Sequence, residues 1–237
     1  MWLENFFKLA SIRDHHYCTK FISDRSIILD FGSCLGEFSK EINIKHKCSC
    51  YAVEALPENF NKISINEKIK KFNYAISNYN GTINFYTSKN PEAHSIFNKP
   101  ESIITIQVLS VTFESFIERI QVDNIDLIKL DIEGAEIQLF DSTSNKTLSK
   151  IKQISIEFHD FINPSKFESD VLRIIKRLEE YGGFYQINFS RLYHYDVLFL
   201  NRQIFSYSDY IKIKYLARFY ERLKRKLFTT FIKAKGI

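Results

Sequence analysis

The segment from Asp126 to Glu136, read as DLIKLDIEGAE, constrains the fold more than any other stretch of the chain. Its mostly apolar first half predicts a buried strand, and Gly134 supplies a tight turn into a helix. Asp131 and Glu133 therefore fall at the carboxyl end of the strand, where open α/β sheets bind their ligands. Carboxylates are costly at such a place unless they are solvated, paired or used. The segment predicts either a functional site or a polar turn in which Glu136 supports the helix.

The rest of the chain alternates between strand-like and helix-like patterns. This alternation predicts an α/β fold, a Rossmann-like three-layer sandwich around a mostly parallel sheet. Two consecutive strands near the end of the domain predict an antiparallel edge strand. The predicted strands are 27–30, 48–53, 72–76, 125–131, 153–158, 184–189 and 196–201, with a hairpin partner at 81–86 and an extended stretch at 103–111. The predicted helices are one that follows the glycine loop after Asp30 and ends near residue 44, and those at 57–69, 113–120 and 167–181.

The length of 237 residues and a hydrophobic content of 45% suffice for one sizeable core with appendages. We expect an amphipathic helical segment in residues 1–25, one ligand-binding domain in residues 26–205, and a basic amphipathic helix in residues 206–237. No stretch has the apolar length of a membrane span, and no signal-like cleavage site follows the start. The four cysteines form no CxxC pair, so the cytoplasm is the expected compartment.

Basic residues are concentrated at the end of the chain. Residues 212–237 contain nine Lys or Arg and one acid, a net charge of +8, whereas the whole chain carries +5. Apolar residues recur there at steps of three and four, which predicts an amphipathic helix. This helix either packs its apolar stripe on the domain, the commoner case, or lies on an anionic membrane surface as a peripheral contact. No nucleic-acid partner is expected, because no recognition motif accompanies the charge.

The first glycine loop, ILDFGSCLGEF, indicates which kind of ligand the sheet binds. Gly32 and Gly36 stand four residues apart, and Cys34 occupies the position where a dinucleotide-binding loop needs its second glycine. Asp30 and Glu37 add negative charge that repels phosphates and suits a ligand with an ammonium and a sulfonium group, such as S-adenosylmethionine. Structural turn glycines are the alternative interpretation.

A second acidic residue follows the next predicted strand. Glu54 stands where an acidic side chain accepts hydrogen bonds from two ribose hydroxyls. Together with the glycine loop, Glu54 favours binding of an adenosyl ligand.

Six segments in order give the chain a resemblance to the FkbM family of S-adenosylmethionine-dependent methyltransferases. The resemblance covers roughly residues 27–158, and it rests on DFGSCLGEF, VEALPENF, NYAISNYNGTINFY, TFESF, DLIKLDIEGAE and ISIEFH. It implies a class I methyltransferase fold, a seven-stranded sheet whose last strand runs antiparallel. It also implies methyl transfer, usually to an oxygen of a sugar or related metabolite.

The resemblance also implies which residues bind the cofactor. The methionine part is assigned to the glycine loop, the ribose to the acidic strand end, and the adenine to the neighbourhood of the third strand, with Asp131 facing the methionine end or the acceptor. The expected residues are Asp30, Gly32, Ser33 and Gly36 for the first region, Glu54 and Ala55 for the second, and Asn73, Tyr74 and Ala75 for the third. The chain departs from the family where Ser33-Cys34 replace Ala-Asn and Glu114 replaces Asp, which leaves room for a divergent or inactive member.

Four residues are candidates for catalysis: Asp131, Glu133, Glu157 and His159. Methyl transfer from a sulfonium requires an aligned acceptor and, for a hydroxyl, the removal of a proton. Glu157 and His159 project from the same face of the neighbouring strand. The unperturbed pKa of histidine suits a general base, although a histidine at a strand end is more often a hydrogen-bonded surface residue.

Several acids and one histidine can also hold a divalent metal ion. Metal dependence is not favoured and no metal ligand is assigned, because nothing in the sequence fixes a ligand geometry. The other histidines, His15, His16, His46, His94 and His194, show no equally placed partners. Of these, only His94 is expected to touch the substrate, since it lies in a surface loop or lid at residues 90–101.

Three functions remain open from the sequence. The first is an O-methyltransferase that acts on a small molecule, a glycan or a lipid-linked sugar, held near the inner face of a membrane by the basic helix. The second is a non-catalytic scaffold that keeps the fold and binds a partner through its tail. The third is a nicotinamide-dependent oxidoreductase, which the missing glycine at Cys34 disfavours.

Overall fold

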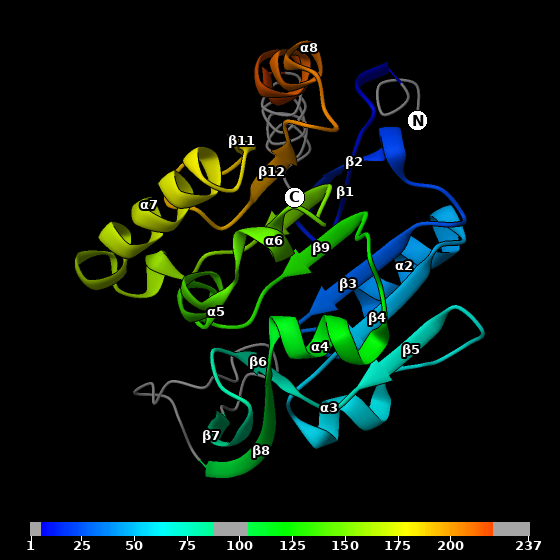
Figure 1. Ribbon diagram of the computed structural model, residues 1–237, viewed down its shortest axis with the longest axis vertical. Coiled ribbons are helices and arrows are strands. Elements are labelled where there is room, and N and C mark those ends of the chain that lie inside the picture. The colour runs from blue at the N-terminus through cyan, green and yellow to red at the C-terminus, as the bar shows by residue number, and fades with distance from the viewer. Residues whose placement is uncertain (1–5, 88–103, 220–237) are drawn as a thin grey trace, which may run out of the picture.

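The computed structural model describes residues 6–87 and 104–219. A seven-stranded sheet with the order β11-β12-β10-β9-β3-β4-β5 forms the centre of the molecule (Figure 1). All neighbours from β10 through β5 run parallel. The strands are β3 (Ile27–Phe31), β4 (Ser49–Val53), β5 (Ile69–Phe72), β9 (Leu127–Leu130), β10 (Gln153–Ile156), β11 (Phe184–Asn188) and β12 (Val197–Asn201). This strand order confirms the predicted α/β sandwich and the class I methyltransferase arrangement.

The antiparallel strand lies one place inside the edge where it was predicted. β12 runs antiparallel to both β10 and β11, so the edge strand β11 is parallel to the rest of the sheet. The burial of the two strands explains this order. Every residue of β12 is buried, whereas Tyr185, Gln186 and Asn188 of β11 are only partly buried. A strand that is apolar on both faces takes an inner position.

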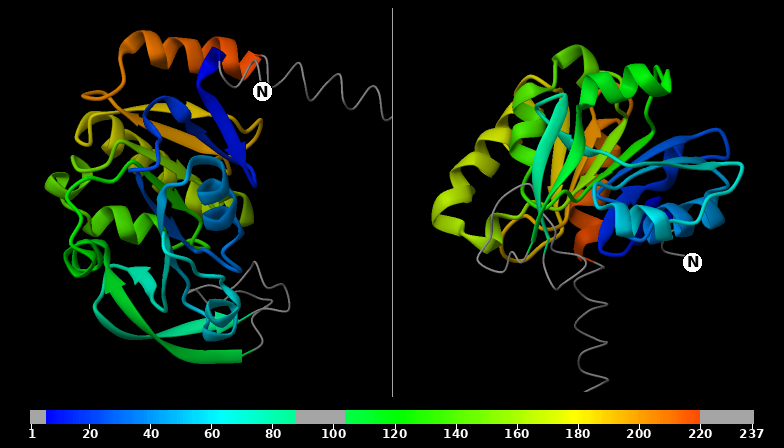
Figure 2. Two further views of the ribbon diagram at one scale, coloured as in Figure 1. Left: turned by 90° about the vertical axis from the view of Figure 1, so that its right-hand side faces the viewer. Right: turned by 90° about the horizontal axis from the view of Figure 1, so that it is seen from below.

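Helices cover both faces of the sheet, as the view from below shows (Figure 2). Side chains of α4 (Phe113–Ile120), α5 (Glu136–Ser142), α6 (Asn145–Leu148) and α7 (Pro164–Glu180) join one large core cluster with the strands. The opposite face packs against α2 (Glu37–His46), and further along against a helix that begins with α8 (Tyr207–Ile211) and continues as a π-helical segment, η3 (Lys212–Ala217).

The prediction of a helix in residues 1–25 is wrong for the part that the structure describes. Residues 9–18 form a β-hairpin of β1 (Leu9–Ile12) and β2 (His15–Cys18), followed by the 3-10 turn η1 (Thr19–Phe21). Arg13 and Asp14 at the tip have φ angles of 47° and 62°. A two-residue turn with positive φ at both positions matches the twist of a hairpin. The hairpin buries apolar side chains between the sheet and its neighbours, so it belongs to the domain and is no separate segment.

The region after β4 also differs from the prediction. The helix α3 (Pro57–Lys62) ends seven residues before the predicted limit, where the Lys71 ammonium donates to the carbonyl oxygens at the helix end. The Asn66 side chain then accepts the amide hydrogens of Lys68 and Ile69 in a turn. β5 therefore begins early, and the chain then leaves the main sheet. A three-stranded sheet follows, made of β6 (Ala75–Ser77), β7 (Gly81–Thr87) and β8 (Ile104–Thr112). The predicted loop at 90–101, with His94, lies outside the described residues.

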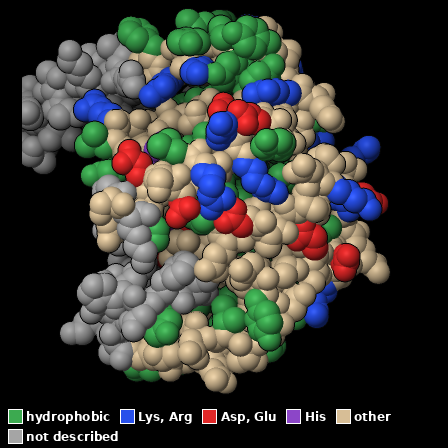
Figure 3. Space-filling view, turned by 60° about the vertical axis from the view of Figure 1, so that its left-hand side comes forward, with side chains coloured by type: hydrophobic (Ala, Val, Ile, Leu, Met, Phe, Trp, Pro, Cys, Tyr) green, Lys and Arg blue, Asp and Glu red, His purple; other side chains and the backbone are tan. Residues whose placement is uncertain are grey.

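The predicted C-terminal helix is present from Tyr207 as far as residue 219, and residues 220–237 lie outside the described part. Ile213 of this helix is buried against the sheet, whereas Tyr215, Leu216 and Phe219, the members of the predicted apolar stripe that the structure describes, are exposed. The packing interpretation of the stripe is therefore wrong for this part of the helix. Hydrophobic side chains gather at this end of the molecule, while acids and bases are interspersed over the face of α5 and α7 (Figure 3). Membrane contact stays a prediction, and no helix in the described ranges is long and apolar enough to cross a bilayer.

Candidate functional site

The site lies where the strand order reverses. β3 has β4 on one side and β9 on the other, so the strand order runs in opposite directions on the two sides of β3. The carboxyl ends of the strands at such a switch point form the ligand-binding edge of open α/β sheets. The glycine loop at residues 32–36 follows β3, and Asp131 follows β9. The sheet therefore brings the two most informative sequence segments together.

The glycine loop packs directly against the chain that follows β9. Gly32 has a φ of +73°, and a Cβ atom built on it would lie 1.7 Å from the carbonyl oxygen of Asp131. Gly36 has a φ of +77° and lies against Ile63. Cys34, between them, also adopts a positive φ of 49°. Gly32 thus serves the close contact between two backbone segments as well as the turn.

One side chain of the loop is buried without a partner. The Ser33 hydroxyl and one oxygen of Asp30 are among the buried polar atoms in the described residues that have no hydrogen-bond partner. Buried hydroxyl groups in proteins are nearly always hydrogen-bonded. An unpartnered hydroxyl in a loop at the switch point therefore fits a polar ligand that supplies the missing hydrogen bond.

Glu54, predicted to bind ribose, lies beside the glycine loop at the end of β4. Its two carboxylate oxygens accept the amide hydrogens of Cys34 and Leu56, each at 2.8 Å. Asn73 donates from its side-chain amide to the carbonyl oxygens of Glu54 and Ala55, at 2.8 and 2.9 Å. These contacts fix the strand end relative to the loop. Of the other predicted adenine neighbours, Tyr74 lies under the Arg119 guanidinium and Ala75 is buried in β6.

The buried position of Glu54 makes stability depend on pH. Burial raises the pKa of Glu54 from 4.5 to about 7, so the folded chain retains a proton that the unfolded chain releases. The stability that this group contributes is fully present below about pH 4.5 and is lost as the pH rises through about 7. We expect the stability of the wild type, relative to Glu54→Gln, to fall by roughly 2 to 3 kcal/mol between about pH 5 and pH 8.

The measurement is urea unfolding of both proteins at several pH values. Glutamine loses one backbone hydrogen bond, but that cost is the same at every pH and other titrating groups cancel in the difference. A difference in stability that does not change with pH would show that Glu54 is ionised throughout.

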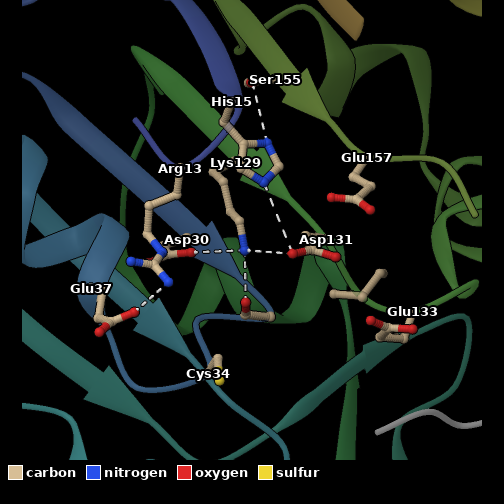
Figure 4. A network of polar contacts seen from close by, with 12 residues as sticks. Arg13, His15, Asp30, Cys34, Glu37, Lys129, Asp131, Glu133, Ser155 and Glu157 are labelled. Atoms are coloured by element: carbon tan, nitrogen blue, oxygen red, sulfur yellow. Dashed lines mark hydrogen bonds and ion pairs between the residues drawn. The ribbon is translucent and has the colours of Figure 1, made fainter. Parts of the chain in front are cut away.

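Lys129 is a buried cation at the centre of the site (Figure 4). Its ammonium group donates to the carbonyl oxygen of Gly32 at 2.7 Å and lies 3.3 Å from Asp131 and 3.6 Å from Asp30. Burial by itself would lower the pKa of Lys129, but the carboxylates of Asp131 and Asp30 hold it above its usual value. The sequence analysis missed this residue, although a lysine within an apolar central strand must be paired when it is buried.

The two acids that were expected to face the ligand, Asp30 and Glu37, lie beside cations of the protein, Lys129 and Arg13. Asp30 is fully buried, with one oxygen accepting a 2.7 Å hydrogen bond from Ser39 and the other turned to Lys129. Glu37 pairs with Arg13 of the hairpin at 2.8 Å. The charge argument from Asp30 and Glu37 therefore needs correction, because both are neutralised by neighbours. Asp30 acts on the site indirectly, through its contact with Lys129 and through the glycine loop that follows it.

The four residues predicted for catalysis do lie together. Nε2 of His159 is 3.4 Å from Glu133, 3.6 Å from Asp131 and 3.9 Å from Glu157. The other ring nitrogen, Nδ1, is 3.1 Å from Glu136. The side chain of His159 is 5% exposed, whereas those of Asp131 and Glu157 are 28% and 29% exposed. The histidine is thus held inside, and the carboxylates form the accessible rim.

Glu136 organises the turn that carries these acids. Its carboxylate, 1% exposed, accepts the amide hydrogens of Ile132 and Gly134 at 3.1 and 3.2 Å and also contacts His159. Glu133 has a φ of 55°, which is uncommon for a residue with a side chain. The buried Glu136 therefore does more than support a helix, because it ties the turn after β9 to the residues after β10.

The charges of this cluster shift the pKa values of its members. Burial by itself would lower the pKa of His159, but Glu136 and Glu133 raise it well above the usual range. Burial would also raise the pKa of Asp131, but Lys129 and the two histidines hold it well below its usual range. Burial and the charge of Asp131 raise the pKa of Glu157 to about 7. Strongly perturbed groups at one edge of a sheet are typical of functional sites.

The hairpin adds a residue that the sequence analysis rejected. Nε2 of His15 lies 3.9 Å from Asp131, and its Nδ1 lies 3.5 Å from the Ser155 hydroxyl (Figure 4). His16, His46 and His194 also have partners, namely Asp196, Tyr17 and Asp160. The expectation that none of these histidines has a partner as well placed as those of His159 is therefore wrong for His15. No pattern in the sequence reveals such pairs, because each joins residues that are far apart in the chain.

Comparison with protein-family models identifies the family of the chain. The model described as the methyltransferase FkbM domain matches residues 30–185, which include the glycine loop, Glu54 and all four candidate catalytic residues. This chain belongs to the FkbM methyltransferase family. The match thus extends to the start of β11, beyond the range of the resemblance seen in the sequence. No curated protein matches the chain significantly.

Solved structures of methyltransferases resemble this FkbM protein at low identity. Precorrin-6y C5,15-methyltransferase from Geobacter metallireducens has 10% identity and a TM-score of 0.41, with 76% of this chain and 82% of that chain covered. TrmK from M. capricolum, in complex with S-adenosyl-homocysteine, has 13% identity and a TM-score of 0.41, with 77% and 64% covered. A Staphylococcus aureus protein, provisionally assigned as a caffeoyl-CoA O-methyltransferase, has 9% identity and a TM-score of 0.47, with 84% and 79% covered.

Proposed function

We propose that this FkbM protein is an S-adenosylmethionine-dependent O-methyltransferase that acts on a hydroxyl group of a sugar, a glycan or a related metabolite. The observation that carries the proposal is the meeting of three features at the switch point of the sheet. These are the glycine loop with its unpartnered Ser33 hydroxyl, the buried Glu54 beside it, and the acid and histidine cluster after β9 and β10. Membership of a methyltransferase family supports methyl transfer as the reaction at this site.

The glycine loop and the end of β4 are the proposed cofactor side. When bound, S-adenosylmethionine supplies a methyl group that is already activated by a positively charged sulfur. Gly32 and Gly36 let the loop turn and pack closely against Asp131 and Ile63, which positions its backbone for the ligand, and Ser33 offers an unsatisfied hydroxyl. Glu54 has one further lone pair on each oxygen for ribose hydroxyls. Asn73 holds the peptide groups of Glu54 and Ala55 in place.

The acid and histidine cluster is the proposed acceptor side. We assign Glu157 as the group that accepts the proton of the hydroxyl, because its carboxylate is accessible and stands at the rim. His159 is nearly fully buried and has carboxylates around both ring nitrogens, so it orients the acids more readily than it reaches the acceptor. Asp131, paired with Lys129, stands between the loop and Glu157 and aligns the acceptor oxygen.

Calorimetry and a turnover assay test the proposal. The protein should bind S-adenosyl-homocysteine and not NADH, and it should transfer labelled methyl groups from S-adenosylmethionine to one class in a panel of free, nucleotide-linked and lipid-linked sugars. Asp131→Asn should bind S-adenosyl-homocysteine within about threefold of the wild type yet lose about 100-fold or more in transfer. Asp123→Asn, the same change at an exposed site, is the matched control.

Two results would contradict the proposal in different ways. Binding of S-adenosyl-homocysteine without labelling of any sugar class would favour the cofactor-binding scaffold. Binding of NADH instead would favour the oxidoreductase.

A further inference from the structure

Nε2 of His159 faces three carboxylates, and the nearest of them, that of Glu133, lies 3.4 Å away. The distances from its Nε2 atom are 3.4, 3.6 and 3.9 Å. Charge-assisted hydrogen bonds between nitrogen and a carboxylate are about 2.7 to 2.9 Å long. The same chain shows what a direct pair looks like, because Nδ1 of His16 and of His194 lie 2.6 and 2.7 Å from their aspartates. The wider spacing around His159 therefore differs from that of an ordinary histidine–aspartate pair.

The spacing matches ligand atoms around a shared cation. Atoms that each lie about 2 Å from one metal ion are separated from one another by roughly 3 to 4 Å. One nitrogen or oxygen atom each from Asp131, Glu133 and His159 falls within 4.8 Å of the others. A second group, made of His15, Asp131 and Glu157, satisfies the same condition on the other side of Asp131.

The surroundings of His159 are those of a metal ligand. Its Nδ1 is fixed at 3.1 Å from the buried carboxylate of Glu136, which turns Nε2 toward Asp131 and Glu133. Histidines that bind metals usually hold their second ring nitrogen in this way. Asp131 presents one oxygen to Lys129 and the other to His159, so Lys129 leaves the second oxygen available.

We propose that Asp131, Glu133 and His159 form a binding site for a divalent transition-metal ion, such as Mn²⁺ or Zn²⁺, at the acceptor side of the site. One nitrogen and two carboxylate ligands suit these ions better than Ca²⁺ or Mg²⁺. The role of the ion rests on the proposed function. A metal at this position would bind the hydroxyl oxygen of the acceptor and ease loss of its proton to Glu157. The binding of the ion itself can be measured without cofactor or acceptor.

The test is calorimetric titration of the full chain with Mn²⁺ and with Zn²⁺, after removal of metals by chelation and in the absence of S-adenosylmethionine. We expect about one ion per chain and a rise in the melting temperature on binding. Glu133→Gln and His159→Gln should each weaken binding by at least about tenfold. His46→Gln, which changes a histidine bound to Tyr17 away from the site, should bind like the wild type.

Further variants keep the result interpretable. Glu133 lies in the turn after β9 and is more exposed than His159, with side-chain exposures of 16% and 5%, so its variant gives an answer even when His159→Gln fails to fold. His15→Gln should retain most of the affinity; if it abolishes binding while His159→Gln does not, the assignment to this triad is overturned. Absence of binding to the wild type at about millimolar Mn²⁺ and Zn²⁺ overturns the site altogether.

Loss of the metal inference leaves the proposed function standing, and the reverse also holds. S-adenosyl-homocysteine binding and methyl transfer that persist in excess chelator refute a catalytic role of the ion. Metal binding by a chain that fails to bind S-adenosyl-homocysteine would refute the methyltransferase proposal alone.

Discussion

Replacing Gly32 by alanine is expected to lower the free energy of unfolding by about 3 to 5 kcal/mol and to abolish binding of S-adenosyl-homocysteine. The added Cβ atom would lie 1.7 Å from the carbonyl oxygen of Asp131, which is backbone and cannot rotate away. The loop must therefore move off the chain after β9. Because Lys129 donates to the carbonyl oxygen of Gly32, this movement also breaks the contact between the loop and the buried ion pairs.

Gly183→Ala is the matched control for this prediction. Gly183 has a φ of +71°, nearly the same as that of Gly32, but no atom lies within 4 Å of a Cβ built on it. Its substitution should cost only the strain of the left-handed backbone, about 1 to 2 kcal/mol, and leave cofactor binding unchanged. Urea unfolding and calorimetry measure both effects. Equal losses of stability in the two variants would show that backbone strain, and not the contact with Asp131, makes Gly32 necessary.

Lys129→Met should be nearly as damaging, with a loss of about 3 to 5 kcal/mol in the free energy of unfolding. Methionine fills a similar volume but leaves Asp30 buried without a cation and the Gly32 carbonyl oxygen without its donor. Lys152→Met is the control, since Lys152 pairs with Asp126 at 2.7 Å in a more exposed position. That change should cost about 1 kcal/mol or less.

A double-mutant cycle shows whether the charge of Asp30 causes the loss. Combining Lys129→Met with Asp30→Asn removes the unpaired charge, so the double variant should be less destabilised than the sum of the single variants, by about 1 to 3 kcal/mol. Strict additivity of the two changes would mean that Lys129 contributes through packing instead. The unfolding midpoint in urea at neutral pH gives all four corners of the cycle.

Sequence patterns predicted the fold well where local rules decide the structure. The βα order, the glycine turns and the helix at Phe113–Ile120 follow from periodicity and turn residues. The order of the last two strands required tertiary burial, because only packing places the fully buried β12 inside β11. The hairpin at residues 9–18 was missed because its turn, Arg13-Asp14, has none of the usual turn glycines or asparagines.

The sequence allowed the acidic residues of the candidate site to be predicted, but not its cationic residues. Asp131, Glu133 and Glu157 follow apolar strands, and a strand end is a local signal. Lys129, Arg13 and His15 contribute through contacts with residues that are distant in the chain, as in the approach of Lys129 to Gly32. Their presence changes the interpretation of the acids, because Asp30 is a buried counterion of Lys129 and Glu37 pairs with Arg13 at the surface.

The position of β12 has a consequence for biosynthesis. The ribosome releases β11 before β12, yet β12 separates β11 from β10 in the finished sheet. β11 therefore has no correct neighbour until residue 201 has left the exit tunnel, and the site-forming strands β3, β9 and β10 can assemble earlier. The strand pair can join the sheet only once β12 is available, and β12 then covers an edge of β10 that would otherwise stay open to other chains.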